Sequence, residues 1–177
     1  MLLSLADLSL RGGDSYERIY MLESEPVVLG GAEYRVLLPD GVHIKVDRIT
    51  GGFLVNLDLD ARMYGPCARC LGEAVLEVHA EQQEFAPTAK DGWEETEESE
   101  FIHDLVVDVD GLAREALILS LPSQVVCGEG CKGLCAVCGK DLNKGPCGCA
   151  DQKIDERWSR LKGLRLDEGD EPPVKGS

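Results

Sequence analysis

The chain contains few basic residues, few aromatic residues and no long apolar run. Its 177 residues include 18 Lys and Arg against 33 Asp and Glu, which gives a formal net charge of -15, and only 5% are aromatic. Because nucleic-acid backbones bind to positive surfaces, this charge excludes a protein that binds nucleic acid with its whole surface. No stretch of roughly 18 uninterrupted apolar residues is present, so we expect no membrane-spanning helix. The first residues lack the basic start of a secretory signal, and we therefore expect a cytoplasmic protein.

The motifs of common catalytic and nucleotide-binding sites are also missing. No P-loop, no G-x-G-x-x-G motif after a strand and no recognisable Ser/His/Asp arrangement is present. The histidines, His43, His79 and His103, stand alone in the sequence, and we predict plain surface positions for them. A thiol redox site at Cys67 and Cys70 is disfavoured, because the pair follows a strand and not the helix start that would lower a thiol pKa. The sequence therefore predicts a protein that is not an enzyme and takes no small-molecule substrate.

Alternating apolar residues predict that most of the first 85 residues form β structure. The clearest alternation covers residues 53–63, and another covers residues 73–81. Residues 42–46 also alternate, after the turn tripeptide Pro39-Asp40-Gly41, and Gly51 and Gly52 mark the next turn. Strands joined by such turns predict an antiparallel sheet or a partly open β-barrel, within an α+β fold.

The composition changes after residue 85. Nine acidic residues and no Lys or Arg lie between Asp91 and Asp110, which predicts an acidic loop over about residues 86–104. Residues 105–109 then predict a short strand. Apolar residues at helical spacing follow and predict a helix near residues 110–120, with Asp110 as its N-cap and Pro122 beyond its end. We therefore expect residues 1–126 to form a β-rich core domain.

The eight cysteines exceed what packing requires, and their spacing predicts metal sites. Two close pairs separated by eight residues, which are typical of a four-thiolate zinc site, are Cys135 with Cys138 and Cys147 with Cys149. The other four cysteines form a second candidate set, namely Cys67, Cys70, Cys127 and Cys131. The loop inside this second set has 56 residues, compared with eight in the first set. The longer loop raises the entropic cost of closure by about 1.7 kcal/mol. This set therefore requires a fold that brings its two pairs together.

Disulfides and an iron–sulfur cluster are the alternatives to zinc. Disulfides are disfavoured because the cytosol keeps thiols reduced, and a cluster is disfavoured because no C-x2-C-x2-C run is present. We therefore predict one or two Zn²⁺ ions, each held by four thiolates. A zinc ion with four protein ligands has no open position for water, so such a site is structural and not catalytic.

A short C-terminal helix is predicted over residues 151–164, directly after the last cysteine. Its apolar stripe contains Trp158 and is expected to dock on the Cys-rich module or the sheet. Residues 127–165 carry eight basic and five acidic side chains, so this part of the acidic chain has a charge of +3. The candidate contacts to RNA or another partner are Lys132, Lys140, Lys144, Lys153, Arg157 and Arg160. We expect residues 127–165 to form a Cys-rich metal module packed on the core, and residues 166–177 to form a disordered tail.

Several short motifs follow one another in a fixed order between residues 50 and 164. They are Cys67-Ala68-Arg69-Cys70-Leu71, Leu119-Ser120-Leu121-Pro122, the cysteine-rich run at residues 127–139, Leu142-Asn143, Cys147-Gly148-Cys149 and Asp155-Glu156-Arg157-Trp158. Together they resemble the YceD family of bacterial and chloroplast proteins, which are described as large ribosomal RNA subunit accumulation proteins. Ala136 stands where many members of that family have proline.

The resemblance implies a non-enzymatic role in the accumulation or processing of large-subunit ribosomal RNA, or in ribosome assembly. The expected partner is ribosomal RNA or a ribosome-assembly intermediate, contacted through the zinc-held module. The alternative is an acidic adaptor or chaperone that binds a basic ribosomal protein and does not touch RNA. The family supplies no catalytic residues that could be placed on this chain.

Overall fold

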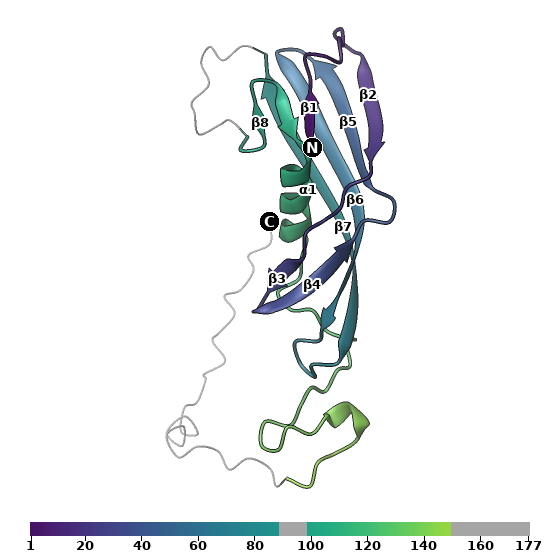
Figure 1. Cartoon of the computed structure of the whole chain (residues 1–177), viewed down its shortest axis with the longest axis vertical. Helices are drawn as coiled ribbons and strands as arrows, with labels where there is room; N and C mark the ends of the chain where they lie inside the picture. Colours follow the sequence, from purple (N-terminus) through teal and green to yellow (C-terminus); the bar gives the residue numbers. More distant parts are fainter. Residues whose placement is uncertain (89–98, 150–177) are drawn as a thin grey trace, which may run out of the picture.

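The computed structural model describes residues 1–88 and 99–149, and a long antiparallel sheet forms most of it (Figure 1). The strands are β1 (Leu2–Ser4), β2 (Ser15–Tyr20), β3 (Val27–Leu29), β4 (Ala32–Leu37), β5 (Val42–Ile49), β6 (Gly52–Pro66), β7 (Glu73–Pro87), β8 (Ile102–His103) and β9 (Val106–Asp108). The helices are α1 (Val109–Leu119) and a 3-10 turn at Leu142–Lys144. None of the helices within the described ranges is long and apolar enough to cross a membrane.

The hairpin of β6 and β7 is the centre of the sheet. The two strands pair along their whole length, from Gly52 opposite Pro87 to Pro66 opposite Glu73. The other edge of β6 pairs first with β5 and then, over residues 62–64, with β4. Strand β2 continues the sheet beyond β5, and β3 continues it beyond β4. The sheet is open and does not close into a barrel, so the first of the two predicted architectures is confirmed.

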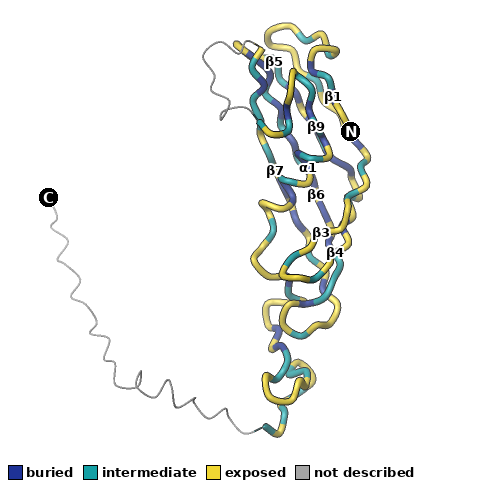
Figure 2. Tube along the Cα trace, turned by 60° about the vertical axis from the view of Figure 1, so that its left-hand side comes forward, coloured by how far each residue is buried: buried dark blue, intermediate teal, exposed yellow. Residues whose placement is uncertain are grey.

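The core lies between one face of this sheet, helix α1 and the small sheet β1-β9-β8. Every second side chain of β6 is buried from Phe53 to Met63, as its period-two pattern predicts. Helix α1 contributes Leu112, Ala116 and Leu117 and contacts β7 and β6. The burial colours in Figure 2 follow this arrangement, with dark blue segments running along the inner strands. The α+β fold therefore positions one long hairpin whose turn leads to the cysteines.

Three boundaries differ from the expectations. Helix α1 begins at Val109 with Asp108 as its N-cap, two residues before the predicted N-cap Asp110, which lies in the first turn. Strand β7 continues to Pro87 and β8 covers residues 102–103, so both ends of the predicted acidic loop belong to strands or turns. The middle of that loop, residues 89–98, lies outside the described residues. The predicted C-terminal helix and tail also lie outside them, together with Lys153, Arg157 and Arg160.

The outer face of the sheet is polar, and both histidines of its strands lie beside carboxylates, with His43 Nε2 2.7 Å from Glu17. His79 on β7 lies across from β6, with its Nδ1 atom 3.0 Å from an oxygen of Asp60. Its Nε2 atom lies 3.3 Å from Glu81 and 3.4 Å from Asp58. The hydrogen bonds to Asp60 and then to Glu81 raise the pKa of His79 above its ordinary value of 6.5. The prediction of a surface position holds, but the sequence pattern missed these carboxylate partners.

Candidate metal centres

The first cluster joins the tip of the β6–β7 hairpin to the chain that follows α1. Cys67 and Cys70 lie in the hairpin turn, and Cys127 and Cys131 lie in the segment after the helix. The Sγ atoms of Cys67 and Cys131 are 3.7 Å apart, as are those of Cys70 and Cys127. All four sulfur atoms lie within 4.8 Å of one another. The pairing that the sequence left dependent on the fold is therefore present.

These distances fit four thiolates around one ion. Sulfur atoms at about 2.3 Å from a tetrahedral zinc ion are about 3.8 Å from one another. The S–S bond of a disulfide is only about 2.05 Å long, whereas all eight cysteines of this chain are free. The distances in this cluster therefore differ from those of a disulfide and are compatible with a bound metal ion.

Hydrogen bonds of the chain around the cysteines hold the first cluster together. The Ala68 amide donates to the Val125 carbonyl at 2.8 Å, and the Leu134 amide donates to the Arg69 carbonyl at 3.1 Å. The Arg69 guanidinium donates to the Cys131 carbonyl at 3.3 Å. The hairpin turn is thus bound to the later segment on both sides of the cluster. These contacts offset the entropic cost of bringing together cysteines that are far apart in the chain.

The second cluster lies beyond the first and is formed by a single stretch of chain. Its members are Cys135, Cys138, Cys147 and Cys149, and their sulfur atoms also lie within 4.8 Å of one another. The Sγ atoms of Cys135 and Cys147 are 3.4 Å apart. None of these four is buried, whereas Cys67 and Cys131 of the first cluster are part of the hydrophobic core. The two clusters therefore have the same ligand type but different surroundings.

The two C-x2-C turns have the same hydrogen-bond pattern. The amide two residues after the first cysteine donates to its sulfur at 3.4 Å in both, from Arg69 to Cys67 and from Val137 to Cys135. The amide four residues after it donates to its carbonyl, at 3.0 Å from Leu71 and 2.8 Å from Gly139. Both of these last residues have a left-handed backbone, with φ of 59° and 71°. Each turn therefore directs its amides at a sulfur atom, as a turn that holds a thiolate requires.

We expect Leu71→Gly to leave the thermal midpoint unchanged or to raise it slightly. A left-handed leucine costs about 1–2 kcal/mol, and glycine removes that cost while losing about 0.5–1 kcal/mol through its freer unfolded chain. Leu71 is 69% exposed, so little packing is lost. Leu71→Val should lower the midpoint, because a β-branched residue tolerates positive φ poorly. Thermal unfolding followed by circular dichroism tests this. Gly139→Ala is the reverse change at the same position of the other turn. Equal destabilisation by glycine and valine at position 71 would contradict it.

Within each cluster, the pKa values of the cysteines are shifted in opposite directions. Burial of Cys67 opposes its ionisation, but the amides of Cys70, Cys127 and Arg69 outweigh burial and lower its pKa to about 6. The amides of Cys138 and Val137 lower the pKa of Cys135 to about 6. In contrast, neighbouring sulfur atoms raise the pKa of Cys127 and of Cys149 to about 12. The fold therefore favours the thiolate form of Cys67 and Cys135 and the thiol form of Cys127 and Cys149.

Asn143 lies in the loop of the second cluster, between Cys138 and Cys147, and contacts Cys131 of the first. Its residue type alone did not predict a place in the site. Its side-chain amide donates to the sulfur of Cys131 at 3.6 Å, and its side-chain oxygen accepts from the Lys132 amide at 2.8 Å. The Leu142 amide donates to the Gly133 carbonyl at 2.9 Å. The only signal for this residue in the sequence is the Leu142-Asn143 motif of the family resemblance.

The described candidate lysines all lie on the cysteine-rich segment. Lys132, Lys140 and Lys144 are exposed. The ammonium group of Lys140 donates to the Pro146 carbonyl at 2.9 Å, and that of Lys144 lies 3.7 Å from Asp141. The structure therefore brings three of the six candidate basic residues to the end of the molecule that carries the clusters.

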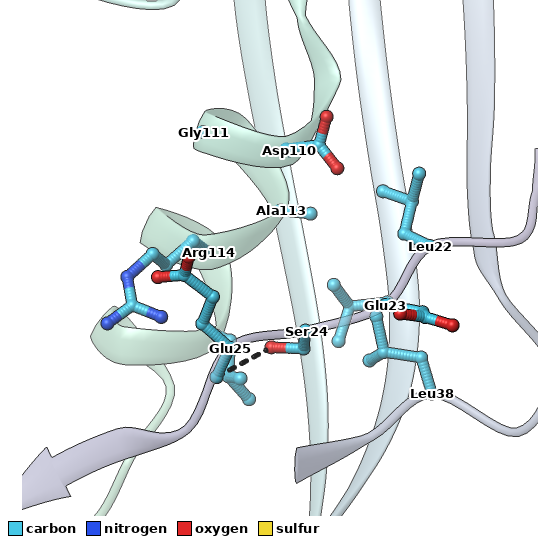
Figure 3. A pocket seen from close by; sticks show the side chains of 11 residues that line it. Leu22, Glu23, Ser24, Glu25, Leu38, Asp110, Gly111, Ala113 and Arg114 are labelled. Carbon is cyan, nitrogen blue, oxygen red and sulfur yellow. Dashed lines mark hydrogen bonds between the residues drawn. The ribbon is translucent and has the colours of Figure 1, made fainter. Parts of the chain in front are cut away.

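A separate pocket of about 340 Å³ lies between α1 and the segment that joins β2 to β3 (Figure 3). Its floor is apolar, with Leu38, Leu59 and Leu117 among the lining residues. Its rim carries the carboxyl groups of Glu23, Glu25 and Asp110 and the guanidinium of Arg114. No cysteine lines this pocket, so it is distinct from both clusters.

The fold and the two clusters define the class of protein: an open antiparallel sheet that carries two four-cysteine groups, each able to hold a metal ion. A family model described as Large ribosomal RNA subunit accumulation protein YceD matches residues 55–165, a range that contains all eight cysteines. The chain therefore belongs to the YceD family, and the resemblance seen in its motifs is confirmed.

Individual relatives agree with this assignment. An uncharacterized protein of Mycobacterium tuberculosis is 32% identical over 121 residues, which are 67% of this chain and 58% of the relative. An uncharacterized protein of Mycobacterium leprae is 29% identical over 70% of this chain and 58% of its own length. The chloroplastic Large ribosomal RNA subunit accumulation protein YCED homolog 1 of Arabidopsis thaliana is 32% identical over 59 residues, 33% of this chain and 18% of the relative. The match thus spans little more than half of the mycobacterial relatives. No solved structure matches the chain.

Proposed function

We propose that the protein is a non-enzymatic factor in the accumulation of large-subunit ribosomal RNA, and that two structural zinc ions hold its RNA-contacting end. The observation that carries this proposal is the presence of two four-thiolate clusters inside the part of the chain that matches the YceD family. The name of the family supports the process, and the clusters support a folded, metal-held module as the part that acts in it.

Zinc is the ion that suits both clusters best. Four cysteine sulfurs in a closed tetrahedral arrangement are a common ligand set of structural zinc, and this ligand set leaves no position for a reacting water. The sulfur–sulfur distances of 3.7 Å in the first cluster agree with that arrangement. In this proposal, the zinc ions fix the backbone that presents Lys132, Lys140 and Lys144. We include Lys153, Arg157 and Arg160 in the same surface from the sequence alone.

The RNA contact is tested by a triple substitution of Lys132, Lys140 and Lys144 by alanine. We expect the affinity for large-subunit ribosomal RNA fragments to fall, and the slope of log K against log salt to decrease by about 2–3, because each lost phosphate contact removes about 0.7–0.9 from it. A gel shift titrated with salt measures both. The matched control replaces Lys45, Arg62 and Arg114, which lie on the sheet and on α1 and change the net charge equally.

Two results would contradict the proposed contact. Equal losses in the two triple variants would show that only net charge matters. Absence of RNA binding at low salt by the unmodified protein, together with capture of a basic ribosomal protein, would favour the acidic adaptor, which the net charge of -15 supports.

A further inference from the structure

Strand β7 is a long edge of the sheet that no other described strand covers. It has 15 residues and pairs only with β6, whereas the other two edges, β2 and β3, have six and three residues. Figure 2 shows β7 at the border of the sheet, beside β6. Near its end, residues 85–87 line a small hollow together with Ser99, Ile102 and Leu105. The stretch that remains available for pairing is therefore residues 75–83.

Such an edge exposes backbone groups that can pair with another chain. Alternate residues of an edge strand point their amide and carbonyl groups away from the sheet. Proteins with uncovered edges usually shorten, bend or charge them, and binding proteins use them to add a strand from a partner. Because β7 is long and pairs with β6 along its whole length, its inner edge is fixed in one register. The backbone therefore suits the addition of a strand.

The side chains beside this edge select the charge of the added strand. On the outer face, Glu77 and Glu81 of β7 are each 76% exposed. Asp58 and Asp60 lie on the neighbouring strand β6, and the facing basic groups are Arg62, 3.3 Å from Glu77, and His79 between three carboxylates. Carboxylates thus outnumber cations at this place. A strand whose outward side chains are Lys or Arg would place them next to Glu77 and Glu81, where cross-strand pairs of opposite charge stabilise a sheet.

The same charges disfavour a second copy of this chain. If two β7 strands paired antiparallel with His79 at the centre, Glu77 of each copy would lie opposite Glu81 of the other. Like charges in directly opposite positions destabilise a sheet. On the inner face, half-buried Leu76 would pack against an apolar side chain of the added strand. The occupant that fits is an extended segment in which basic and apolar residues alternate.

We propose that the edge of β7, at residues 75–83, binds an extended Lys/Arg-rich segment of another protein as an additional antiparallel or parallel β-strand. This surface lies on the sheet and is separate from the cysteine clusters. It does not depend on the proposed RNA contact, and it gives the acidic part of the protein a function of its own.

The first test measures binding of a fluorescent 12-residue peptide of alternating Lys and Val to the full chain by anisotropy. The variant Glu77→Gln with Glu81→Gln should weaken binding about tenfold or more. The matched variant, Glu17→Gln with Glu33→Gln, removes two acids of β2 and β4 and should change the affinity less than about threefold. A peptide of alternating Glu and Val should not bind. Equal losses in the two variants would overturn the proposal, because binding would then follow net charge alone.

The second test detects the backbone hydrogen bonds that an added strand would form. Hydrogen exchange measured by NMR should show that alternate amides within residues 75–83 become protected when the peptide is added, and N-methylation of alternate peptide residues should abolish binding. Binding without new protection in β7, or protection of these amides in the free chain by a dimer or by another part of the same chain, would overturn the proposal. Because neither readout involves RNA, failure here leaves the gel-shift test of the proposed function unaffected, and the reverse also holds.

Discussion

Replacement of Cys131 by serine should destabilise the whole protein, whereas the same replacement at Cys138 should affect only the outer end of the cysteine-rich segment. Cys131 is 8% exposed, and its partner Cys67 is fully buried in the core at the end of β6. Loss of the proposed metal ion would leave only hydrogen bonds to join the hairpin turn to the chain after α1. Cys138 is exposed and belongs to a cluster closed within 15 residues of chain, between Cys135 and Cys149.

The expected losses of stability in the two serine variants differ accordingly. Structural zinc contributes apparent binding free energies on the order of 10 kcal/mol, similar to the whole stability of a domain. We expect Cys131→Ser to cost at least about 3 kcal/mol and to lower the thermal midpoint by roughly 10 °C, with a change of only a few degrees for Cys138→Ser. Thermal unfolding by circular dichroism measures this.

Native mass spectrometry gives the number of ions, which we expect to be two in the unmodified chain and one in Cys138→Ser. The hydroxyl group of Tyr34 donates to the Pro66 carbonyl at 2.8 Å, directly before Cys67, so the near-UV spectrum should report on the first cluster. An unchanged near-UV spectrum after chelation, or equal midpoints for the two serine variants, would contradict the different roles of the clusters.

Gly65→Ala should also destabilise the protein strongly, although it adds a single methyl group. A Cβ atom at Gly65 would overlap the ring of Tyr34, which is buried and held at its hydroxyl by Pro66. The ring must move, and overpacking of this kind costs about 1–3 kcal/mol. Because Gly65 precedes Cys67 by two residues, the displacement should also weaken retention of the first metal ion.

Chemical unfolding and a competition assay with a zinc-binding dye measure the two effects of Gly65→Ala. The control is Gly12→Ala, since no atom lies within 4 Å of a Cβ at that position and its backbone has an ordinary negative φ. Loss of stability without faster release of zinc would show that the strand end and the cluster are not coupled.

The sequence predicted the parts of the fold that repeat along the chain. The alternation in β6 and β7 extends over many residues with one buried face, so it identified both strands and their antiparallel pairing. Strands β2 and β3 were missed because β2 buries only Tyr20 and β3 has three residues. The N-cap of α1 was misplaced by two residues because Asp108 and Asp110 are equally good N-cap residues by type.

The cysteine groups were predictable by their spacing, but the features that position them were not. Sequence spacing identifies Cys135 to Cys149 as a local set, and it leaves the pairing of Cys67 and Cys70 open until the hairpin brings them to Cys127 and Cys131. The contacts of Val125, Arg69 and Asn143 are made through the backbone or across the fold. Such contacts depend on three-dimensional proximity, which residue type does not encode.

The length of the β6–β7 hairpin keeps the charges of the two ends of the molecule independent. A strand of 15 residues is up to about 50 Å long, whereas charges in physiological salt are screened over about 8 Å. Carboxylates near the Gly52 end are therefore several screening lengths away from the lysines near Cys131. A polyanion approaching that end of the protein would experience its local field alone, and the overall acidity would have little influence on the encounter.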